Sequence, residues 1–208
     1  MKLMYSMLFI FLWSITHATE MPFWKAKEKV YKRVAEQREV VVSVKVNKLS
    51  GSTKELVMQG AGHASTPLDF TYQEAKKFEN FPKMSGYVRE TQYTPQTKQL
   101  FMHSEAFGYH ARMLFQLDFK ESDEKRKVIS YKIISGVFAG MQGELAFEDV
   151  GRRKTEISMT GVYPFEKLPV PAFFAEFGLE VILQKMATRI RAYVEEQYQK
   201  VNVQKEAS

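Results

Sequence analysis

With 208 residues, 45% of them hydrophobic and 26% charged, the chain is long and apolar enough for one globular domain and is not a disordered protein. It contains no cysteine, which excludes disulfides and thiolate metal sites. The net charge of +6 favours anionic partners such as lipid headgroups, but the basic residues are spread along the chain and form no nucleic-acid recognition motif.

The first residues have the pattern of a secretory signal peptide. Lys2 is the charged start, Leu3 to Ile15 is almost entirely apolar, and Thr16 to Ala18 matches a small-x-small cleavage site. This apolar run is too short to span a bilayer comfortably. We predict that residues 1–18 are a cleaved signal and that the mature protein is periplasmic or secreted. An uncleaved membrane tether is the alternative.

Residues 19–38 are a basic amphipathic segment in which lysine and arginine outnumber glutamate. Its apolar face contains Phe23, Val30 and Val34, with Trp24 and Tyr31 at the border. Two interpretations follow. The segment rests on an anionic membrane surface, or it packs as a solvated helix on the edge of the domain, which we favour.

The next part of the chain alternates as strands do. Residues 40–46 and 55–61 predict a first hairpin, and further apolar and polar alternation follows after residue 84. The inward positions are Tyr109, Ala111, Met113, Phe115, Leu117 and Phe119, then Ile129, Tyr131 and Ile133, then Leu145 and Phe147, and finally Ile157, Met159 and Tyr163. One apolar and one polar face per strand predict an antiparallel sheet that is covered on one side.

A short helix is expected between these strands, over residues 66–81. Thr66 is a suitable cap, Pro67 fits the first turn, and Pro82 is expected to end the helix. One face of this helix is formed by Leu68, Tyr72, Ala75, Phe78 and Phe81. The helix therefore lays large apolar side chains on the mouth of a curved sheet.

A long helix is expected over residues 169–199 to cover the sheet. A stripe at helical spacing follows Leu179, Leu183, Met186, Ile190, Tyr193 and Gln197. The first half is apolar around most of its circumference. We place the domain at residues 39–200 and expect a disordered tail over residues 201–208.

The order of these elements resembles the START-like, helix-grip superfamily, which includes polyketide cyclase-like and coenzyme Q-binding proteins. The resemblance covers about residues 53–199 and includes the helix that begins Thr66-Pro67 and ends Phe78-Glu79-Asn80-Phe81-Pro82. Lys77 departs from the family, which usually has aspartate there. The resemblance implies an α+β helix-grip fold, in which a curved antiparallel sheet of about seven strands wraps around a long C-terminal helix. Residues 39–48 would be an added strand.

The resemblance also implies a cavity between sheet and helix. The candidate cavity-lining, ligand-binding residues are Phe78, Phe81, Tyr109, Met113, Phe115, Tyr131, Ile133, Phe147, Met159, Phe174, Phe177 and Val181. Aromatic and methionine side chains suit a deformable apolar pocket. The alternative is that these residues form a filled, dry core.

The sequence offers little catalytic chemistry. His103 and His110 lack metal-site spacing, and we place them on separate strands as surface residues; no metal, cofactor or catalytic residue is predicted. Tyr109, Tyr131 and Tyr163 could hold a ligand carbonyl or hydroxyl, with Arg112 or Glu144 assisting. The glycine-rich run 136–144 is interpreted as a flexible connection, and a lid over the cavity is one use for it.

These observations favour an exported binding or carrier protein for an apolar small molecule, such as a lipid, a quinone or a polyketide-like compound. The alternatives are a cyclase or aromatase on the same fold, or a ligand-free protein that acts at a membrane surface through residues 19–38. The sequence does not determine the oligomeric state.

Overall fold

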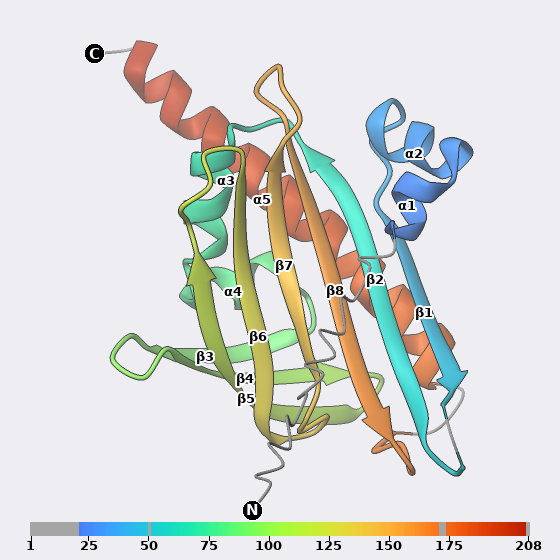
Figure 1. Cartoon of the computed structure of the whole chain (residues 1–208). Coiled ribbons are helices and arrows are strands. Elements are labelled where there is room, and N and C mark those ends of the chain that lie inside the picture. The colour runs from blue at the N-terminus through green and yellow to red at the C-terminus, as the bar shows by residue number, and fades with distance from the viewer. Residues whose placement is uncertain (1–20, 50, 171–173, 207–208) are drawn as a thin grey trace, which may run out of the picture.

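The structure, a computed structural model that describes residues 21–49, 51–170 and 174–206, contains an eight-stranded antiparallel sheet with a long helix along one face (Figure 1). The strands are β1 (Val41–Lys48), β2 (Lys54–Ala64), β3 (Val88–Thr94), β4 (Gln99–Ala106), β5 (Tyr109–Lys120), β6 (Arg126–Gly136), β7 (Gln142–Asp149) and β8 (Thr155–Phe165). Their order in the sheet is β1-β2-β8-β7-β6-β5-β4-β3.

The helical elements account for most of the remaining chain. They are α1 (Phe23–Ala26), α2 (Glu28–Ala35), α3 (Leu68–Ala75), the 3-10 turn η1 (Phe78–Asn80), α4 (Phe81–Met84), the π-helical turn η2 (Phe174–Gly178) and α5 (Leu179–Glu206). This is the predicted α+β helix-grip arrangement. The eighth strand is β1, which corresponds to the added strand expected over residues 39–48.

The sheet is strongly bent, so that β3, β4 and β5 run across the direction of β7, β8 and β2 (Figure 1). The register between β5 and β6 shifts between Leu114 and Phe115, which is the kind of irregularity that bends a strand. Gly136 ends β6 with φ 91°, and a Cβ there would lie 1.9 Å from the carbonyl oxygen of Arg112. Only glycine fits this close approach.

The long helix α5 crosses the inner face of the sheet (Figure 1). Its start is fixed to β1, because Glu176 and Glu180 accept hydrogen bonds from the backbone N–H groups of Val46 (3.1 Å) and Val44 (3.4 Å). The helix continues to Glu206, so the expectation of disorder is wrong for residues 201–206. None of the described helices is both long and apolar enough to cross a membrane.

The helix expected over residues 66–81 is divided into α3, η1 and α4. Ala75 is the last residue of α3, and Pro82 lies in the first turn of α4. The prediction that Pro82 ends a helix is wrong because proline, which lacks an N–H, also fits a first turn. Thr66 does not cap α3 either; its hydroxyl lies 2.6 Å from that of Thr71, in a buried cluster of threonines.

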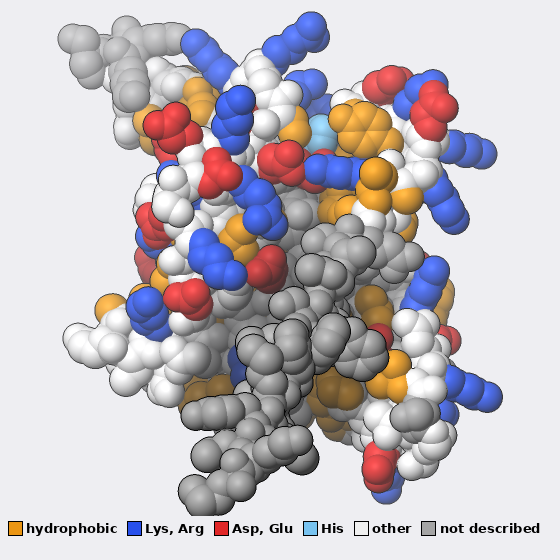
Figure 2. Space-filling view, in the orientation of Figure 1, with side chains coloured by type: hydrophobic (Ala, Val, Ile, Leu, Met, Phe, Trp, Pro, Cys, Tyr) orange, Lys and Arg blue, Asp and Glu red, His pale blue; other side chains and the backbone are white. Residues whose placement is uncertain are grey.

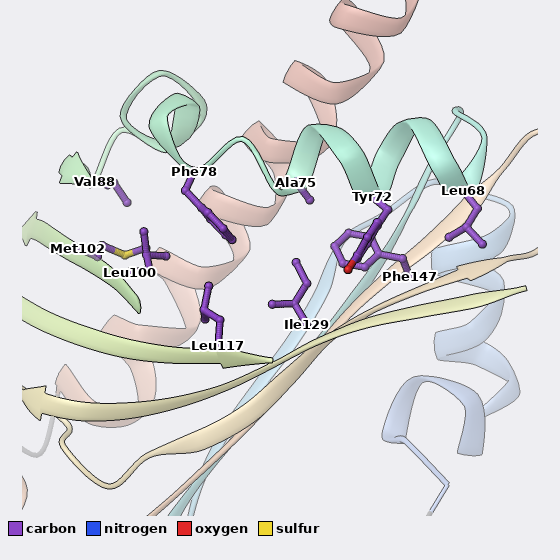
Figure 3. Packing of buried hydrophobic residues seen from close by; sticks show 10 residues of the cluster. All are labelled: Leu68, Tyr72, Ala75, Phe78, Val88, Leu100, Met102, Leu117, Ile129 and Phe147. Atoms are coloured by element: carbon purple, nitrogen blue, oxygen red, sulfur yellow. The ribbon is translucent and has the colours of Figure 1, made fainter. Parts of the chain in front are cut away.

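The apolar face expected for this segment nevertheless packs on the sheet. Figure 3 shows Phe78 directed toward Leu117, and Tyr72 beside Phe147, beneath the helical segment. The rings of Tyr72 and Phe147 meet edge to face with centroids 5.4 Å apart. Burial of these large side chains attaches the segment to the sheet over the cavity described below.

The N-terminal helices α1 and α2 pack on the outer face of the sheet, away from α5. Trp24 and Val34 are 2% and 0% exposed and form a cluster with Val41 and Ala61. The sequence placed Trp24 at the border of the helical face, whereas the structure buries it. The favoured interpretation, packing on the domain edge, therefore describes this segment, and its apolar face is occupied by the sheet.

A buried polar network fixes α1 to β8. The carboxylate of Glu156, 2% exposed, accepts a hydrogen bond from the Trp24 indole (3.3 Å), pairs with Lys25 (3.1 Å) and lies 3.4 Å from His63 Nε2. Burial alone would raise the pKa of Glu156, but the hydrogen bonds from His63, Lys25 and Trp24 outweigh it and hold the pKa below its ordinary value.

Candidate ligand cavity

The main candidate site is an apolar chamber of about 340 Å³ between α5 and the inner face of the sheet. This volume lies within the range of roughly 300–1,000 Å³ that is usual for small-molecule sites. Its walls come from β4, β5 and β6, from the first half of α5, and from Phe78 and Phe81 of the helical segment. The polar side chains in its lining are Tyr87, Ser104, Tyr109, His110 and Tyr131.

A second, smaller chamber of about 130 Å³ adjoins the first along α5. It lies among β1, β2, β7, β8, α3 and the middle of α5. Six residues line both chambers and form the partition between them: Phe81, Leu145, Met159, Leu183, Met186 and Ile190. All six side chains are apolar, so the two chambers are separated only by side-chain packing.

Most of the predicted cavity residues lie at these chambers. The larger chamber is lined by Phe78, Phe81, Tyr109, Met113, Phe115, Tyr131, Ile133 and Met159, and the smaller one by Phe147. The side chain of Phe174 lies outside the described residues. The alternation that predicts the inner face of each strand therefore identified residues of the cavity walls. A ligand-binding role for these residues is still a prediction.

Two predicted positions are wrong. Phe177 is 75% exposed, and Val181 lines neither chamber. The helical period explains Val181, which lies two residues, or about 200° around the helix, from both Leu179 and Leu183. The first half of the helix is apolar around most of its circumference, so its composition does not indicate which face lines the chamber.

The structure adds cavity residues that the list omitted. The α5 stripe of Leu179, Leu183, Met186 and Ile190 lines the larger chamber, and this periodicity was visible in the sequence. Phe138 and Met141, in the connection between β6 and β7, line it as well. They are only 9% and 4% exposed, and the backbone N–H of Met141 donates to the carbonyl of Phe138 at 3.0 Å. The connection between β6 and β7 is therefore a packed turn that forms part of the wall of the larger chamber.

Tyr131 is the polar side chain set deepest among the walls. Its hydroxyl donates to the backbone carbonyl of Thr160 at 3.0 Å, and the hydroxyl end of the side chain lies against Gly143 and Gly161. A Cβ on either glycine would come within 2.7 Å of the Tyr131 oxygen. Burial raises the pKa of Tyr131, so the phenol stays neutral at physiological pH.

The other candidates for polar chemistry lie away from the chambers. Arg112 is exposed and lines neither chamber. The side chain of Glu144 lies on the face of the strand opposite to that of Leu145, and it accepts a hydrogen bond from Ser130 at 3.1 Å. The described lining of both chambers contains no carboxylate side chain. The described walls therefore hold no carboxylate-based acid–base pair, and their titratable side chains are tyrosines, His110 and Arg191.

The two histidines placed on separate strands are neighbours in the structure. His103 on β4 and His110 on β5 have Nε2 and Nδ1 3.2 Å apart and stacked rings with centroids 5.4 Å apart. Antiparallel pairing of β4 with β5 creates this contact, which the spacing of the two residues in the sequence does not reveal. Among the described residues, no group of three metal-ligating side chains occurs here or elsewhere.

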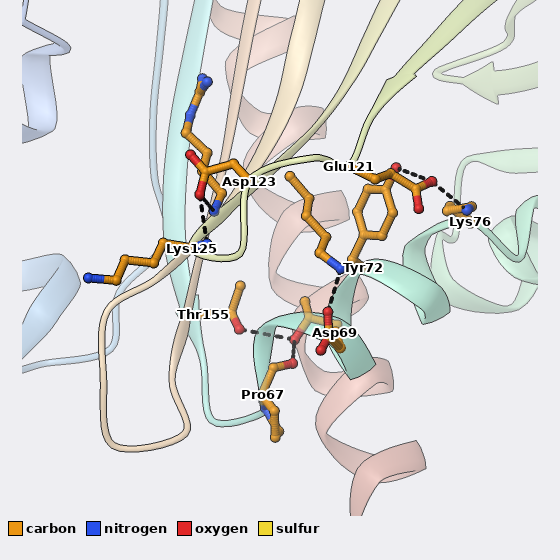
Figure 4. Close-up of polar contacts among 11 residues, drawn as sticks. Pro67, Asp69, Tyr72, Lys76, Glu121, Asp123, Lys125 and Thr155 are labelled. Atoms are coloured by element: carbon orange, nitrogen blue, oxygen red, sulfur yellow. Dashed lines mark hydrogen bonds and ion pairs between the residues drawn. The ribbon is translucent and has the colours of Figure 1, made fainter.

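Polar contacts attach α3 to the sheet above the chambers. The Tyr72 hydroxyl donates to Glu121 at 3.0 Å, Lys76 pairs with the same carboxylate at 2.8 Å, and Asp69 pairs with Lys127 (Figure 4). Burial, together with Glu121, raises the pKa of Tyr72. The hydrogen bond from Lys76 is the main cause that lowers the pKa of Glu121. These contacts hold α3 in place, and α3 forms one wall of the smaller chamber.

The visible surface has no single-sign patch. In Figure 2, Lys and Arg side chains alternate with Asp and Glu over the part of this face that described residues form. Lysine and arginine therefore form no separate basic surface on this part of the molecule.

Known structures with similar folds were found, although no protein-family model and no curated protein matches the sequence significantly. A STAR-related lipid transfer protein from Xanthomonas axonopodis is 8% identical, with a TM-score of 0.55 over 73% of this chain and 98% of that one. An aromatase/cyclase, Zhui, from Streptomyces is 12% identical, with a TM-score of 0.56 over 70% of this chain and 94% of that one.

A human structure gives the same result. The lipid transfer and protein localization domain of human StarD13 is 9% identical, with a TM-score of 0.53 over 84% of this chain and 98% of that one. Identities this low establish the fold and leave the activity open. The curved sheet, the long helix across it and these matches together show that the chain has the START-like helix-grip fold.

Proposed function

We propose that the protein is an exported carrier that binds an apolar small molecule, of the lipid or polyketide-like kind, between α5 and the sheet. The observation that carries this proposal is the larger chamber, about 340 Å³ of space walled by apolar side chains. A filled core, the alternative weighed from the sequence, would have no chamber of this size because protein interiors are normally close-packed.

The proposed ligand class follows from the walls. Burying an apolar surface releases about 25 cal/mol per Å² of area removed from water, whereas an unpaired polar group would be penalised in the same place. Structures of similar fold include one named as a lipid transfer protein and one named as an aromatase/cyclase. These names support an apolar guest, and the almost wholly apolar walls favour carriage over catalysis.

Export is proposed from the sequence of the first residues. Lys2, the apolar run after it and the small residues near Ala18 have the order of a secretory signal. The absence of cysteine does not conflict with an oxidising compartment, since a chain without thiols cannot form wrong disulfides there.

Direct identification of the ligand tests the carrier proposal. The protein is purified from its native host without detergent, and bound small molecules are identified by native mass spectrometry and after solvent extraction. In parallel, a fluorescent fatty acid is titrated into delipidated protein. We expect a co-purified apolar compound and saturable binding. Empty protein combined with no saturable binding contradicts the proposal.

A matched pair of variants locates the binding. Ile133 lines the larger chamber and is 2% exposed, whereas the neighbouring Ile134 lies on the other side of β6 and is 42% exposed. Ile133→Trp should fill the chamber and weaken binding at least about tenfold, which is about 1.4 kcal/mol. Ile134→Trp adds the same side chain outside and should leave binding unchanged. Equal effects of the two variants would place the ligand elsewhere.

A further inference from the structure

We propose that the bound ligand has a single unbranched apolar chain, which passes through the partition so that its end occupies the smaller chamber. This inference rests on the proposed carrier function and adds the ligand's shape. Its basis is the arrangement of the two chambers, which lie side by side along α5 and share six lining residues.

The size of the smaller chamber restricts what enters it. Its 130 Å³ is slightly below the roughly 150 Å³ of an engineered apolar cavity that takes up benzene. It therefore accepts a short run of methylene groups or at most one small ring. A fused polycyclic skeleton fits neither this chamber nor the passage to it, and would be confined to the larger chamber.

The smaller chamber exists because β2 lacks side chains at the relevant positions. Leu56 and Met58 fill the inner face of β2 near its start, but the next two inward positions are Gly60 and Gly62, which line the smaller chamber. Their missing side chains leave room between β2 and the middle of α5. The chamber is thus a property of the sequence of β2.

The partition contains two side chains that can move aside. Met159 on β8 and Met186 on α5 are unbranched and only partly buried, and methionine changes rotamer readily within a core. A thin, flexible chain needs only such rotamer changes to pass, because the partition involves no hydrogen bond of these side chains. A rigid, wide ligand would have to displace Phe81 and Leu145 as well.

The distribution of polar groups sets the direction of the chain. In the smaller chamber, the Thr71 hydroxyl donates to the Pro67 carbonyl at 2.9 Å, and Arg191 donates to the Arg38 carbonyl. The larger chamber has Tyr109 and His110 in its lining, and both are exposed to solvent, with His110 also 3.2 Å from His103. The apolar end of the ligand therefore lies in the smaller chamber, and its polar head lies near Tyr109 and His110.

A chain-length series tests the inference. Straight-chain saturated fatty acids, from octanoic to octadecanoic acid, compete with a bound fluorescent fatty acid on delipidated protein. Ala187→Phe fills the smaller chamber, which Ala187 lines, without touching the larger one. We expect wild-type affinity to rise with chain length. In the variant it should stop rising at a shorter chain, with long chains weakened about tenfold and octanoic acid unchanged.

The controls separate the possible outcomes. Thr188→Phe places the same side chain on the exposed side of α5 and should reproduce the wild-type series. Circular dichroism and thermal unfolding confirm that both variants fold. If wild type binds no acid of any length, the carrier function itself fails. If it binds them but Ala187→Phe leaves the length profile unchanged, or if a fused aromatic compound binds more tightly than every chain, only the single-chain inference is overturned.

Discussion

Tyr131 and Gly161 fit together across the sheet, because the Tyr131 hydroxyl occupies the space that a side chain on Gly161 would need. A Cβ at Gly161 would lie 2.7 Å from that oxygen and 3.0 Å from Cε of Met58. Both obstacles are side-chain atoms. At Gly143, in contrast, a Cβ would also lie 2.0 Å from the backbone carbonyl of Thr160. Gly161 thus leaves room for the Tyr131 hydroxyl on the wall of the chamber.

Gly161→Ala should lower the free energy of unfolding by about 1–3 kcal/mol through overpacking. It should also weaken fatty-acid binding, because the displaced Tyr131 ring enters the larger chamber. Tyr131→Phe removes the oxygen and loses one hydrogen bond, at a cost of about 1 kcal/mol. Urea denaturation and probe titration measure both effects.

The double variant is the decisive control for this pair. Once the phenol oxygen is removed, the added methyl group has room, so the combined cost should be smaller than the sum by about 0.5–3 kcal/mol. Costs that add within about 0.5 kcal/mol would show that the two residues are not coupled as described.

Phe78→Ala should destabilise the protein strongly, since Phe78 is 3% exposed and packs between the helical segment and the sheet. We expect a loss of about 3 kcal/mol or more in urea denaturation. Phe177→Ala is the matched control because Phe177 is 75% exposed, and it should change stability by at most about 0.5 kcal/mol. A large cost for Phe177 would contradict its exposed position.

Trp24 reports on the N-terminal helices. The sequence contains two tryptophans, Trp13 and Trp24, so removal of residues 1–18 leaves Trp24 as the single tryptophan, which excitation at long wavelength selects over tyrosine. Since Trp24 is 2% exposed, we expect blue-shifted emission that iodide quenches poorly and that anionic vesicles do not change. A vesicle-induced shift would support the alternative in which this segment binds membranes.

Glu156 should make stability depend on pH in the acid range. Its folded pKa lies below the ordinary 4.5, so its contribution is complete above that value and is lost as the pH falls through the lower folded pKa. Glu156→Gln should cost about 1–3 kcal/mol at pH 7 and flatten the fall of stability below about pH 4.5.

Glu148→Gln is the control for this measurement. Glu148 also pairs with Lys25, at 2.9 Å, but its side chain is 43% exposed. Surface pairs of this kind contribute little, so the variant should keep the wild-type pH profile. An identical profile for Glu156→Gln and wild type would remove Glu156 from the acid transition.

Cleavage after Ala18 is the expected fate of the signal. Intact mass spectrometry of protein recovered from the periplasm or medium should show a chain that begins at Thr19. Changing Ala18 to a bulky residue, such as Ala18→Leu, should block cleavage. A full-length chain retained with membranes would instead support the tether.

The sheet and its inner face could be predicted from the sequence because alternation is a local property of each strand. The inward positions of β5 and β6, such as Met113 and Ile133, follow directly from that period. The two chambers could not be predicted, because they depend on how strands far apart in sequence curve around α5. The role of Gly60 and Gly62 is visible only once both lie opposite the helix.

The errors share a physical origin in tertiary packing. Pro82 suits either the end or the beginning of a helix, and the packing of Phe78 and Phe81 on the sheet decides between them. Trp24 was placed by helical period alone, but a neighbouring carboxylate from β8 draws its indole inward. The local pattern indicates which residues share an apolar face. The surface on which that face packs decides where each of these side chains is buried.

Strand β2 is enclosed by α5 on one face and by α1 and α2 on the other, and every residue from Gly60 to Ala64 is buried. Solvent must breach one of these layers to reach its backbone amides, so they should be among the slowest in the chain to exchange with deuterium. β3 and β4 have no such second cover among the described elements. We therefore expect the half of the sheet beside the smaller chamber to be the more rigid one and the half beside the larger chamber to open more readily, which is where the proposed ligand would enter with the least disruption.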